Sequence, residues 1–224
     1  MKRIILPTLI LLAGLTGCLK ENDLTPTLIT DPVSTYLGTD TLQKSGDLYM
    51  GLQLGATPEE LYPVIQTLQK TSNVGYVNVV ANSFTKLGDL EKRIPLYQAI
   101  DLEQSNGVLV KVYFTEKSVS AIYLSTGRQL TQWPESVAKS RAIAMGDAVD
   151  GLYEKIKALS STATFKSFNL FTKDLTTDYD PAMSLSPQWY FAFSPTFGQT
   201  TLVHLSFSDQ KLKSIMVSKF RQGS

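Results

Sequence analysis

Apolar and polar side chains alternate in two stretches of the chain, one near residue 110 and one near residue 205. Every second residue from 108 to 114 is Val or Phe, and every second residue from 203 to 207 is Val, Leu or Phe. Successive side chains of a strand point to opposite faces of a sheet, so each stretch predicts a strand with one apolar face. We expect a helix to cover that face and to leave the other face open.

Similar patterns predict further strands, which fall into two groups. The first group covers residues 75–84, 96–102, 108–115 and 119–124, and the second covers residues 164–171, 188–193, 201–208 and 212–217. Tight turns are expected at 115–118 and 208–211, where a short polar segment separates two strands. Each group therefore predicts an antiparallel meander.

A helix is expected before each group of strands. Thr57 as N-cap, Pro58 at the first helical position and Glu60 at the third form a capping box. Pro63 falls inside this helix, where it removes a backbone hydrogen bond, so we expect a short first turn and a kink there. The second helix is expected to start from Asp147 as N-cap and to be straighter.

The two halves of the chain also resemble each other in sequence. Residues 54–68 align without gaps on 145–159, and residues 109–116 align on 202–209. The identical pairs of the first block are Gly55/Gly146, Leu61/Leu152, Tyr62/Tyr153, Ile65/Ile156 and Leu68/Leu159. Two blocks in the same order predict an internal duplication, although a single α+β domain with similar-looking elements is the alternative.

The predicted fold class is therefore α+β, with two tandem modules that each pack a short helix on an antiparallel meander sheet. The first module is expected at 45–133 and the second at 134–224. Residues 18–44 contain Pro, Thr and Ser without a sustained apolar period, so we expect a flexible tether there.

Residues 1–17 have the pattern of a secretory signal peptide. Lys2 and Arg3 precede an apolar stretch at 4–15, which is shorter than the about 20 residues of a membrane-spanning helix. The segment Leu15-Thr16-Gly17-Cys18 resembles the bacterial lipobox, which implies cleavage before Cys18 and acylation of its thiol. Two or three acyl chains hold a protein on a membrane where one barely does.

The residues after Cys18 bear on localisation. Leu19-Lys20-Glu21-Asn22-Asp23 resembles the export signal of surface lipoproteins in Bacteroidota. The resemblance implies a protein of the cell envelope, anchored by lipid in the outer membrane and either periplasmic or exposed at the surface.

Composition excludes several function classes. A formal net charge of +1 gives no field that would gather nucleic-acid phosphates, so we expect no nucleic-acid partner. One His and one Cys in 224 residues rule out a Cys/His zinc cluster, a redox Cys pair and an intramolecular disulfide. Asp178 and Asp180 flank Tyr179, but a solvated loop explains them better than a calcium site. We expect no metal and no cofactor.

The order of a Gly, a short helix containing Leu-Tyr, and strands joined by a tight turn is similar to a known repeat. It resembles the modules of the beta-lactamase inhibitory proteins and of the BamE-type outer-membrane lipoproteins, over about residues 46–220. The resemblance implies a protein that binds other proteins through an open sheet and performs no catalysis. Pro63 and a longer segment before the final strands depart from that pattern.

The candidate binding surface consists of polar and aromatic residues on the expected open faces. They are Tyr97, Lys111, Tyr113, Tyr123, Tyr190 and His204. Tyr offers a large contact area at little entropic cost on binding, which suits protein recognition. Packing between the two modules is an equal alternative for these tyrosines, whereas Trp189, Phe191 and Phe193 share a face and are expected in the core.

The expected function is a non-enzymatic, monomeric envelope lipoprotein with a protein partner. A carboxylate-based envelope hydrolase and a carrier of a lipidic ligand are the alternatives. A deep pocket with two close carboxylates would favour the hydrolase, and an apolar cavity between helix and sheet would favour the carrier. A shallow, Tyr-rich sheet would favour the binding protein.

Overall fold

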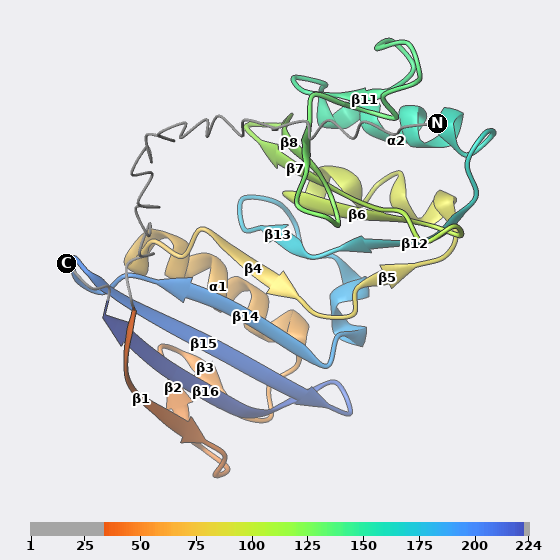
Figure 1. The fold of residues 1–224 in the computed structure, drawn as a ribbon. Helices are drawn as coiled ribbons and strands as arrows, with labels where there is room; N and C mark the ends of the chain where they lie inside the picture. Colours follow the sequence, from red (N-terminus) through yellow and green to blue (C-terminus); the bar gives the residue numbers. More distant parts are fainter. Residues whose placement is uncertain (1–33, 222–224) are drawn as a thin grey trace, which may run out of the picture. The chain divides into compact units, whose positions relative to one another are not determined.

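The computed structural model describes residues 34–221, which form an α+β protein with two antiparallel sheets and few helices, as the sequence predicts (Figure 1). Cys18 and the signal-like segment 1–17 lie outside the described residues. The helices are α1 (Pro58–Ser72), α2 (Leu152–Leu159) and the short 3₁₀ segments η1 (Leu87–Leu90), η2 (Ile94–Leu96), η3 (Val149–Gly151) and η4 (Pro181–Leu185).

The first sheet, called sheet I, is built around the meander of the first half of the chain. Its six strands, in spatial order, are β5 (Ser83–Phe84), β12 (Phe165–Leu170), β6 (Ala99–Gln104), β7 (Leu109–Thr115), β8 (Ser118–Leu124) and β9 (Gln129–Leu130). All of its neighbouring strands pair antiparallel.

The second sheet, called sheet II, is built around the meander of the second half. Its strands, in spatial order, are β1 (Thr35–Leu42), β16 (Lys211–Arg221), β15 (Gln199–Ser208), β14 (Gln188–Phe193), β4 (Tyr76–Val79) and β13 (Thr172–Asp174). Two small hairpins complete the strands: β2 (Leu48–Tyr49) with β3 (Leu52–Gln53), and β10 (Gln132–Trp133) with β11 (Ile143–Ala144).

Each half of the chain places one strand in the interior of the other half's sheet. β4, from the first half, lies between β14 and β13 of sheet II, and β12, from the second half, lies between β6 and β5 of sheet I (Figure 1). The expected single strand at 75–84 is thus divided between the two sheets. Ala81 has a positive φ of 55° in the turn that separates its two parts. Neither sheet consists of one half of the chain alone.

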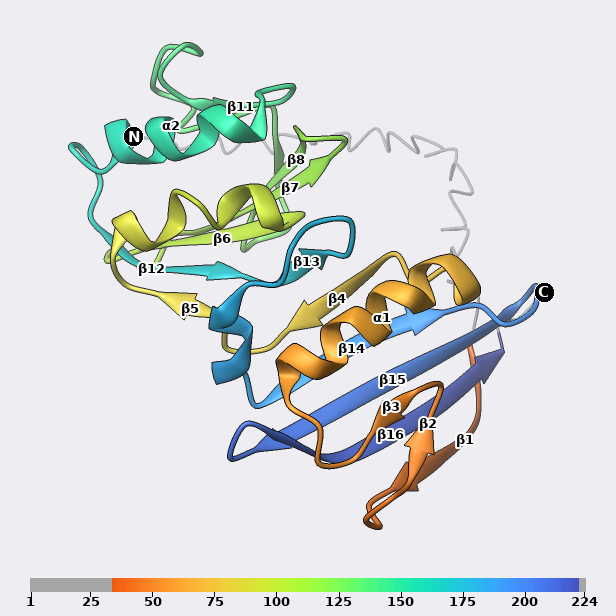
Figure 2. The same cartoon turned by 180° about the vertical axis from the view of Figure 1, so that it is seen from behind.

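The helices follow the exchanged strands, which corrects the expectation that each helix covers the meander of its own half. Leu61 and Ile65 of α1 belong to the same apolar cluster as Val203 and Leu205 of sheet II. The physical reason is connectivity, because three residues separate the end of α1 from β4 and the helix must stay beside that strand. Figure 2 shows α1 lying along β14 and β15.

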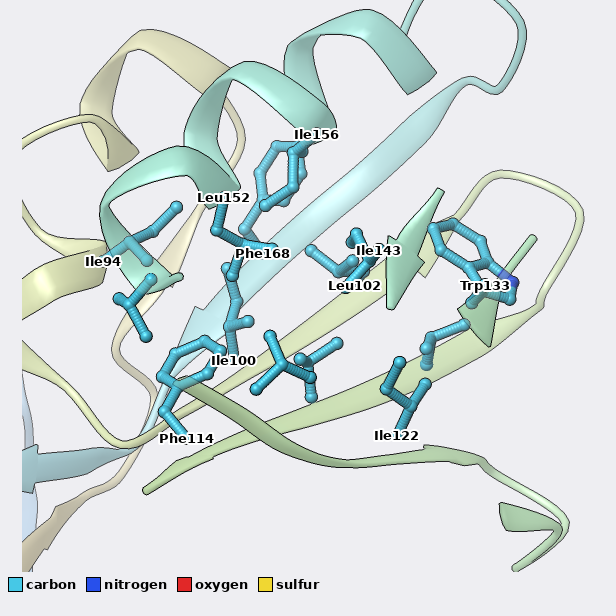
Figure 3. Packing of buried hydrophobic residues seen from close by; sticks show 14 of the residues in the cluster. Ile94, Ile100, Leu102, Phe114, Ile122, Trp133, Ile143, Leu152, Ile156 and Phe168 are labelled. Atoms are coloured by element: carbon cyan, nitrogen blue, oxygen red, sulfur yellow. The ribbon is translucent and has the colours of Figure 1, made fainter. Parts of the chain in front are cut away.

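Sheet I is covered by α2 in the corresponding way. Leu152 and Ile156 of α2 share a cluster with Ile100, Leu102 and Phe168, all of which are at most 2% exposed. Figure 3 shows the two α2 side chains lying over these residues of β6 and β12. Each core is therefore closed by a helix and a strand from the opposite half of the chain.

Aligned positions of the two halves make the same backbone contacts. The Gly55 nitrogen donates to the Leu212 oxygen at 2.8 Å, and the Gly146 nitrogen donates to the Val119 oxygen at 2.9 Å. Both glycines have a positive φ, of 88° and 84°, which only glycine adopts without strain. Common ancestry of the halves stays a prediction, and these contacts agree with it.

The ends of several elements depend on single side chains. The capping box at Thr57 is present, and α1 continues through Pro63 to Ser72. Asp147 does not cap α2, because its Oδ2 accepts from the Ala144 nitrogen and from Lys155 Nζ, each at 2.6 Å. The helix begins later, at Leu152, after a 3₁₀ turn.

Part of the expected tether is a strand. Residues Thr35–Leu42 form β1, which pairs along β16 from Thr35↔Arg221 to Leu42↔Ile215. Its side chains are exposed at most positions, so the apolar alternation that reveals other strands is missing. The free edge of an eleven-residue strand explains its formation, because β16 offers unpaired backbone groups that β1 satisfies.

Candidate binding surface

The open face of sheet I carries a row of polar residues across four strands. The register places Asn169 opposite Asp101, Asp101 opposite Lys111, and Lys111 opposite Tyr123. Lys111 Nζ donates to Asp101 Oδ2 at 2.8 Å. This ion pair is partly shielded from water, because the side chains of Lys111 and Asp101 are 36% and 12% exposed.

Aromatic rings surround that ion pair. Tyr113 meets Tyr123 edge to face with ring centroids 6.0 Å apart, and it meets Phe171 in the same way at 6.2 Å. Lys111 Nζ lies 5.4 Å from the centroid of the Phe171 ring, within cation–π distance. Since Phe171 follows the exchanged strand β12, the second half of the chain completes this surface.

The open face of sheet II carries a second row. Tyr190 lies opposite His204, and His204 lies opposite Met216, which is 36% exposed. The rings of Tyr190 and His204 pack edge to face with centroids 5.4 Å apart. On its other side Tyr190 pairs with Asn78 of the exchanged strand β4.

The two open faces meet at one shallow hollow of about 340 Å³. Its polar and aromatic lining residues are Asn82, Asp101, Lys111, Asn169, Phe171 and Tyr190. Two residues predicted from the sequence, Lys111 and Tyr190, are therefore brought to the same place from different sheets. The remaining exposed-face residues, Tyr113, Tyr123 and His204, extend the surface along the two rows.

Asp101 is the polar group of this hollow with incomplete hydrogen bonding. The residue is 8% exposed, and among the described residues its Oδ1 has no hydrogen-bond partner. A buried acceptor without a donor costs about 1–3 kcal/mol, so this oxygen favours an N–H or O–H group. The sequence analysis did not assign Asp101 to the candidate surface, although Asp101 lies within the predicted strand 96–102.

Tyr97 does not belong to the binding surface, which corrects the prediction for this residue. It is 3% exposed, and its hydroxyl donates to Asp180 Oδ2 at 2.9 Å and accepts from Asn82 Nδ2 at 2.8 Å. Burial raises the pKa of the Tyr97 phenol well above its ordinary value. The expected strand at 96–102 fails at its start, because Ile94–Leu96 form η2 and Tyr97 precedes β6.

A buried amine lies beside Tyr97. Lys173 is 0% exposed, and its Nζ lies 5.1 Å from the ring centroid of Tyr62 and 5.7 Å from that of Tyr97. The amine donates to the backbone carbonyl oxygen of Asp174 at 3.0 Å and to Thr177 Oγ1. Burial lowers the pKa of Lys173 to about 8. No pattern in the sequence marks this lysine as buried.

Asp180 is buried, which corrects the expectation that it lies in a solvated loop, and its carboxylate accepts hydrogen bonds from protein donors. Its Oδ1 accepts from Arg93 Nε at 3.3 Å and from the Ala182 nitrogen at 3.0 Å, while Oδ2 accepts from Tyr97. Its neighbour Asp178 is exposed. Within residues 34–221 no group of three or more His, Cys, Asp or Glu side chains is placed to hold a metal ion.

A larger hollow, with a volume of about 880 Å³, lies elsewhere, beside the C-terminal end of α2. Hydroxyl, amide and small apolar side chains line it, together with Arg141, and no described Asp or Glu does. The spaces between each helix and its sheet are filled by the two apolar clusters. None of the helices within 34–221 has the length and apolarity needed to cross a membrane.

Comparison of the chain with models of known families, with characterised proteins and with solved structures finds no match.

Proposed function

We propose that the chain is a lipid-anchored protein of the cell envelope that binds another protein through its open sheet faces and performs no catalysis. The hollow at which the two faces meet is the observation that carries this proposal. It brings the Lys111–Asp101 ion pair, Phe171 and Tyr190 together on a shallow surface. Aromatic residues beside a partly buried charge pair are the composition of binding hot spots.

The anchor is the second part of the proposal. Cys18 would be acylated after removal of residues 1–17, and the folded part would act at the outer membrane, on its periplasmic or outer side. The described residues begin at Ser34, so the 15 residues from 19 to 33 connect the anchor to sheet II.

Binding is favoured over the two alternatives by the lining of the 340 Å³ hollow and by the packing between each helix and its sheet. Hydrolysis of a glycan would need two carboxyl groups facing one cleft, whereas the 340 Å³ hollow has Asp101 as its one carboxylate among the described lining residues. A lipid carrier would need an apolar cavity between helix and sheet, and both of these spaces hold packed side chains.

Site-specific photocrosslinking in cells tests the binding surface. A photoreactive phenylalanine analogue would replace Tyr113 or Tyr190 in the full-length protein, and crosslinked products would be identified by mass spectrometry. We expect both positions to give the same partner, because both lie on faces that meet at one hollow. Tyr113→Ala and Tyr190→Ala should each weaken that complex by about tenfold or more.

Tyr153 is the matched control. It is half-buried like Tyr113 and Tyr190, but it lies on α2, on the covered side of sheet I. The analogue at Tyr153 should give no crosslink to the partner. A partner captured equally from Tyr153, or no common product from the two open faces, would contradict the proposed surface.

A further inference from the structure

Exposed apolar side chains gather at one end of sheet II. Among the described residues, the large apolar side chains classed as exposed are Tyr36, Leu37, Leu48, Tyr76, Leu185, Phe197 and Met216. Single exposed apolar residues are ordinary on a protein surface, whereas a group of them marks an interaction site. Tyr36, Leu37, Tyr76 and Phe197 form such a group.

Strand register places these four residues at the same end of sheet II. Tyr76 begins β4, which pairs antiparallel with β14 and therefore starts at the end where β14 stops. Thr35 of β1 and Gln199 of β15 both pair with Arg221, so β1 begins, β15 begins and β16 ends at the same end of the sheet. Phe197 lies two residues before Gln199, in the connection from β14 to β15. Figures 1 and 2 both show that connection beside the end of β16.

Local backbone structure explains why Phe197 and Leu37 are exposed. Phe197 is 106% exposed at the tip of the segment that follows β14. Leu37 is 45% exposed because the β1–β16 register shifts between Tyr36 and Gly38, which leaves Leu37 outside the ladder as a bulge. The Tyr36 ring packs against Phe220 at 5.8 Å and is still 58% exposed.

Positive charge borders the group. Lys70, near the end of α1, is exposed and lines a hollow shared with Pro195 of the β14–β15 connection. Arg221, at the end of β16, is exposed as well. Aromatic side chains with a Lys and an Arg nearby suit the boundary between lipid headgroups and acyl chains, where the rings enter the interface and the cations meet phosphate.

Chain connectivity points the same end towards the lipid. The described chain begins at Ser34, next to Thr35, so the segment that leads back to Cys18 joins the fold at this end. The 16 residue steps from Cys18 to Ser34 span at most about 55 Å, which permits other orientations. The exposed aromatic group, and not the length of the connection, selects this one.

We propose that the end of sheet II formed by Tyr36, Leu37, Tyr76 and Phe197 contacts the membrane surface, with Phe197 entering the lipid interface. This inference rests on the proposed anchor at Cys18. It fixes the orientation of the folded part, because the β15–β16 turn at Ser208–Lys211 then points away from the bilayer. The open sheet faces remain accessible to a partner in this orientation.

Fluorescence quenching in vesicles tests this orientation. The acylated full-length protein would be reconstituted in phosphatidylethanolamine–phosphatidylglycerol vesicles with an environment-sensitive label at Thr196→Cys, since acylation uses the Cys18 thiol. We expect blue-shifted emission and strong quenching by lipids that carry spin labels on their acyl chains. The same label at Ser208→Cys, at the other end of the hairpin, should stay in water and be quenched by soluble iodide.

A second substitution isolates the role of Phe197. In the Thr196→Cys protein, Phe197→Ser should reduce lipid quenching several-fold, because the side chain that enters the interface is gone. Leu185→Ser is the matched control: Leu185 is 79% exposed but precedes β14 at its opposite end, so this change should leave quenching unaltered.

Each outcome decides one question. Equal quenching of the labels at 196 and 208 would overturn the orientation. Crosslinking that shows a second copy of the chain covering both labelled positions would overturn it as well. The mass of the N-terminal peptide reports acylation independently. An unmodified Cys18 would contradict the proposed anchor and the orientation with it, whereas an acylated protein whose label at 196 faces water would overturn the orientation alone.

Discussion

Lys173 brings an amine into the junction between the two sheets, where burial lowers its pKa and the nearby carboxylates of Asp174, Asp180 and Asp178 raise it. Burial is the larger effect and lowers its pKa from 10.5 to about 8. The pKa values of three buried or half-buried tyrosines shift in the opposite direction. Burial raises the pKa of Tyr62 and Tyr97 well above 10, and that of Tyr179 to about 12. The free energy of unfolding should therefore depend on pH in two opposite ways, one set by Lys173 and one by these tyrosines.

Between about pH 8 and pH 10 we expect stability to rise with pH. In this range the unfolded chain keeps the Lys173 proton and the folded chain loses it, so unfolding takes up a proton and a higher pH opposes it. The free energy of unfolding should increase by on the order of 2 kcal/mol over this range. Above about pH 10 the buried tyrosines reverse the slope, because they ionise first in the unfolded chain.

Urea midpoints measured at intervals from pH 7 to pH 11 check this. Lys173→Met should flatten the rise between pH 8 and pH 10, and Lys213→Met, at an exposed lysine, should not. An unchanged slope in Lys173→Met would show that the amine is not the group that titrates.

At the scale of the elements, the two meanders turn in the same way. Glu116 and Lys117 connect β7 to β8 with φ of 50° and 58°, and Asp209 and Gln210 connect β15 to β16 with φ of 52° and 55°. Positive φ at both central positions is the two-residue turn whose twist matches that of the flanking strands. None of these four residues is a glycine, so each turn retains backbone strain.

Gly substitution should relieve that strain. Lys117→Gly and Gln210→Gly are each expected to raise the free energy of unfolding by up to about 1 kcal/mol, because glycine adopts a positive φ without a clash. Thr126→Gly is the control in an exposed turn, since Thr126 is not among the described residues with positive φ, and it should be neutral or destabilising. Chemical denaturation of the three variants provides the measurement. Equal effects at all three positions would contradict the assignment of strain to the two tight turns.

The sequence predicted the elements whose signals are local. Alternation located β7 and β15 within two residues at each end, and the capping box at Thr57 located the start of α1. β1 was missed because its two adjacent apolar residues, Tyr36 and Leu37, are followed by Gly and polar residues and give no apolar period. The exchange of β4 and β12 could not be predicted, since the apolar faces of the two meanders are alike and a strand pattern does not specify its neighbour.

The positions of the candidate surface residues were predicted with the same strengths and limits. Lys111, Tyr113 and Tyr190 lie on open faces because they alternate with core residues in regular strands. Tyr97 was misplaced where a 3₁₀ turn ends the regular alternation. The hollow itself depends on the way the two sheets meet, which no local pattern encodes.

At the scale of the whole molecule, strand exchange makes each half of the chain necessary for the core of the other. Leu61 and Ile65 of the first half pack on sheet II, and Leu152 and Ile156 of the second half pack on sheet I. The connection between the halves is an exposed loop in which Lys139 and Ser140 are in contact with solvent. The covalent link at this loop should therefore matter far less than the packing.

A protease site inserted between Lys139 and Ser140 tests this dependence. After cleavage of the folded protein we expect the two fragments to elute together from a sizing column with an unchanged circular dichroism spectrum. The reason is that separation would remove β4 and α1 from sheet II and β12 and α2 from sheet I, exposing both apolar clusters to water. Each fragment purified in denaturant and refolded alone should lack a cooperative unfolding transition, and mixing the two should restore it. Fragments that part in native buffer as two folded monomers would show that each half closes its own core, and the exchange would then be wrong.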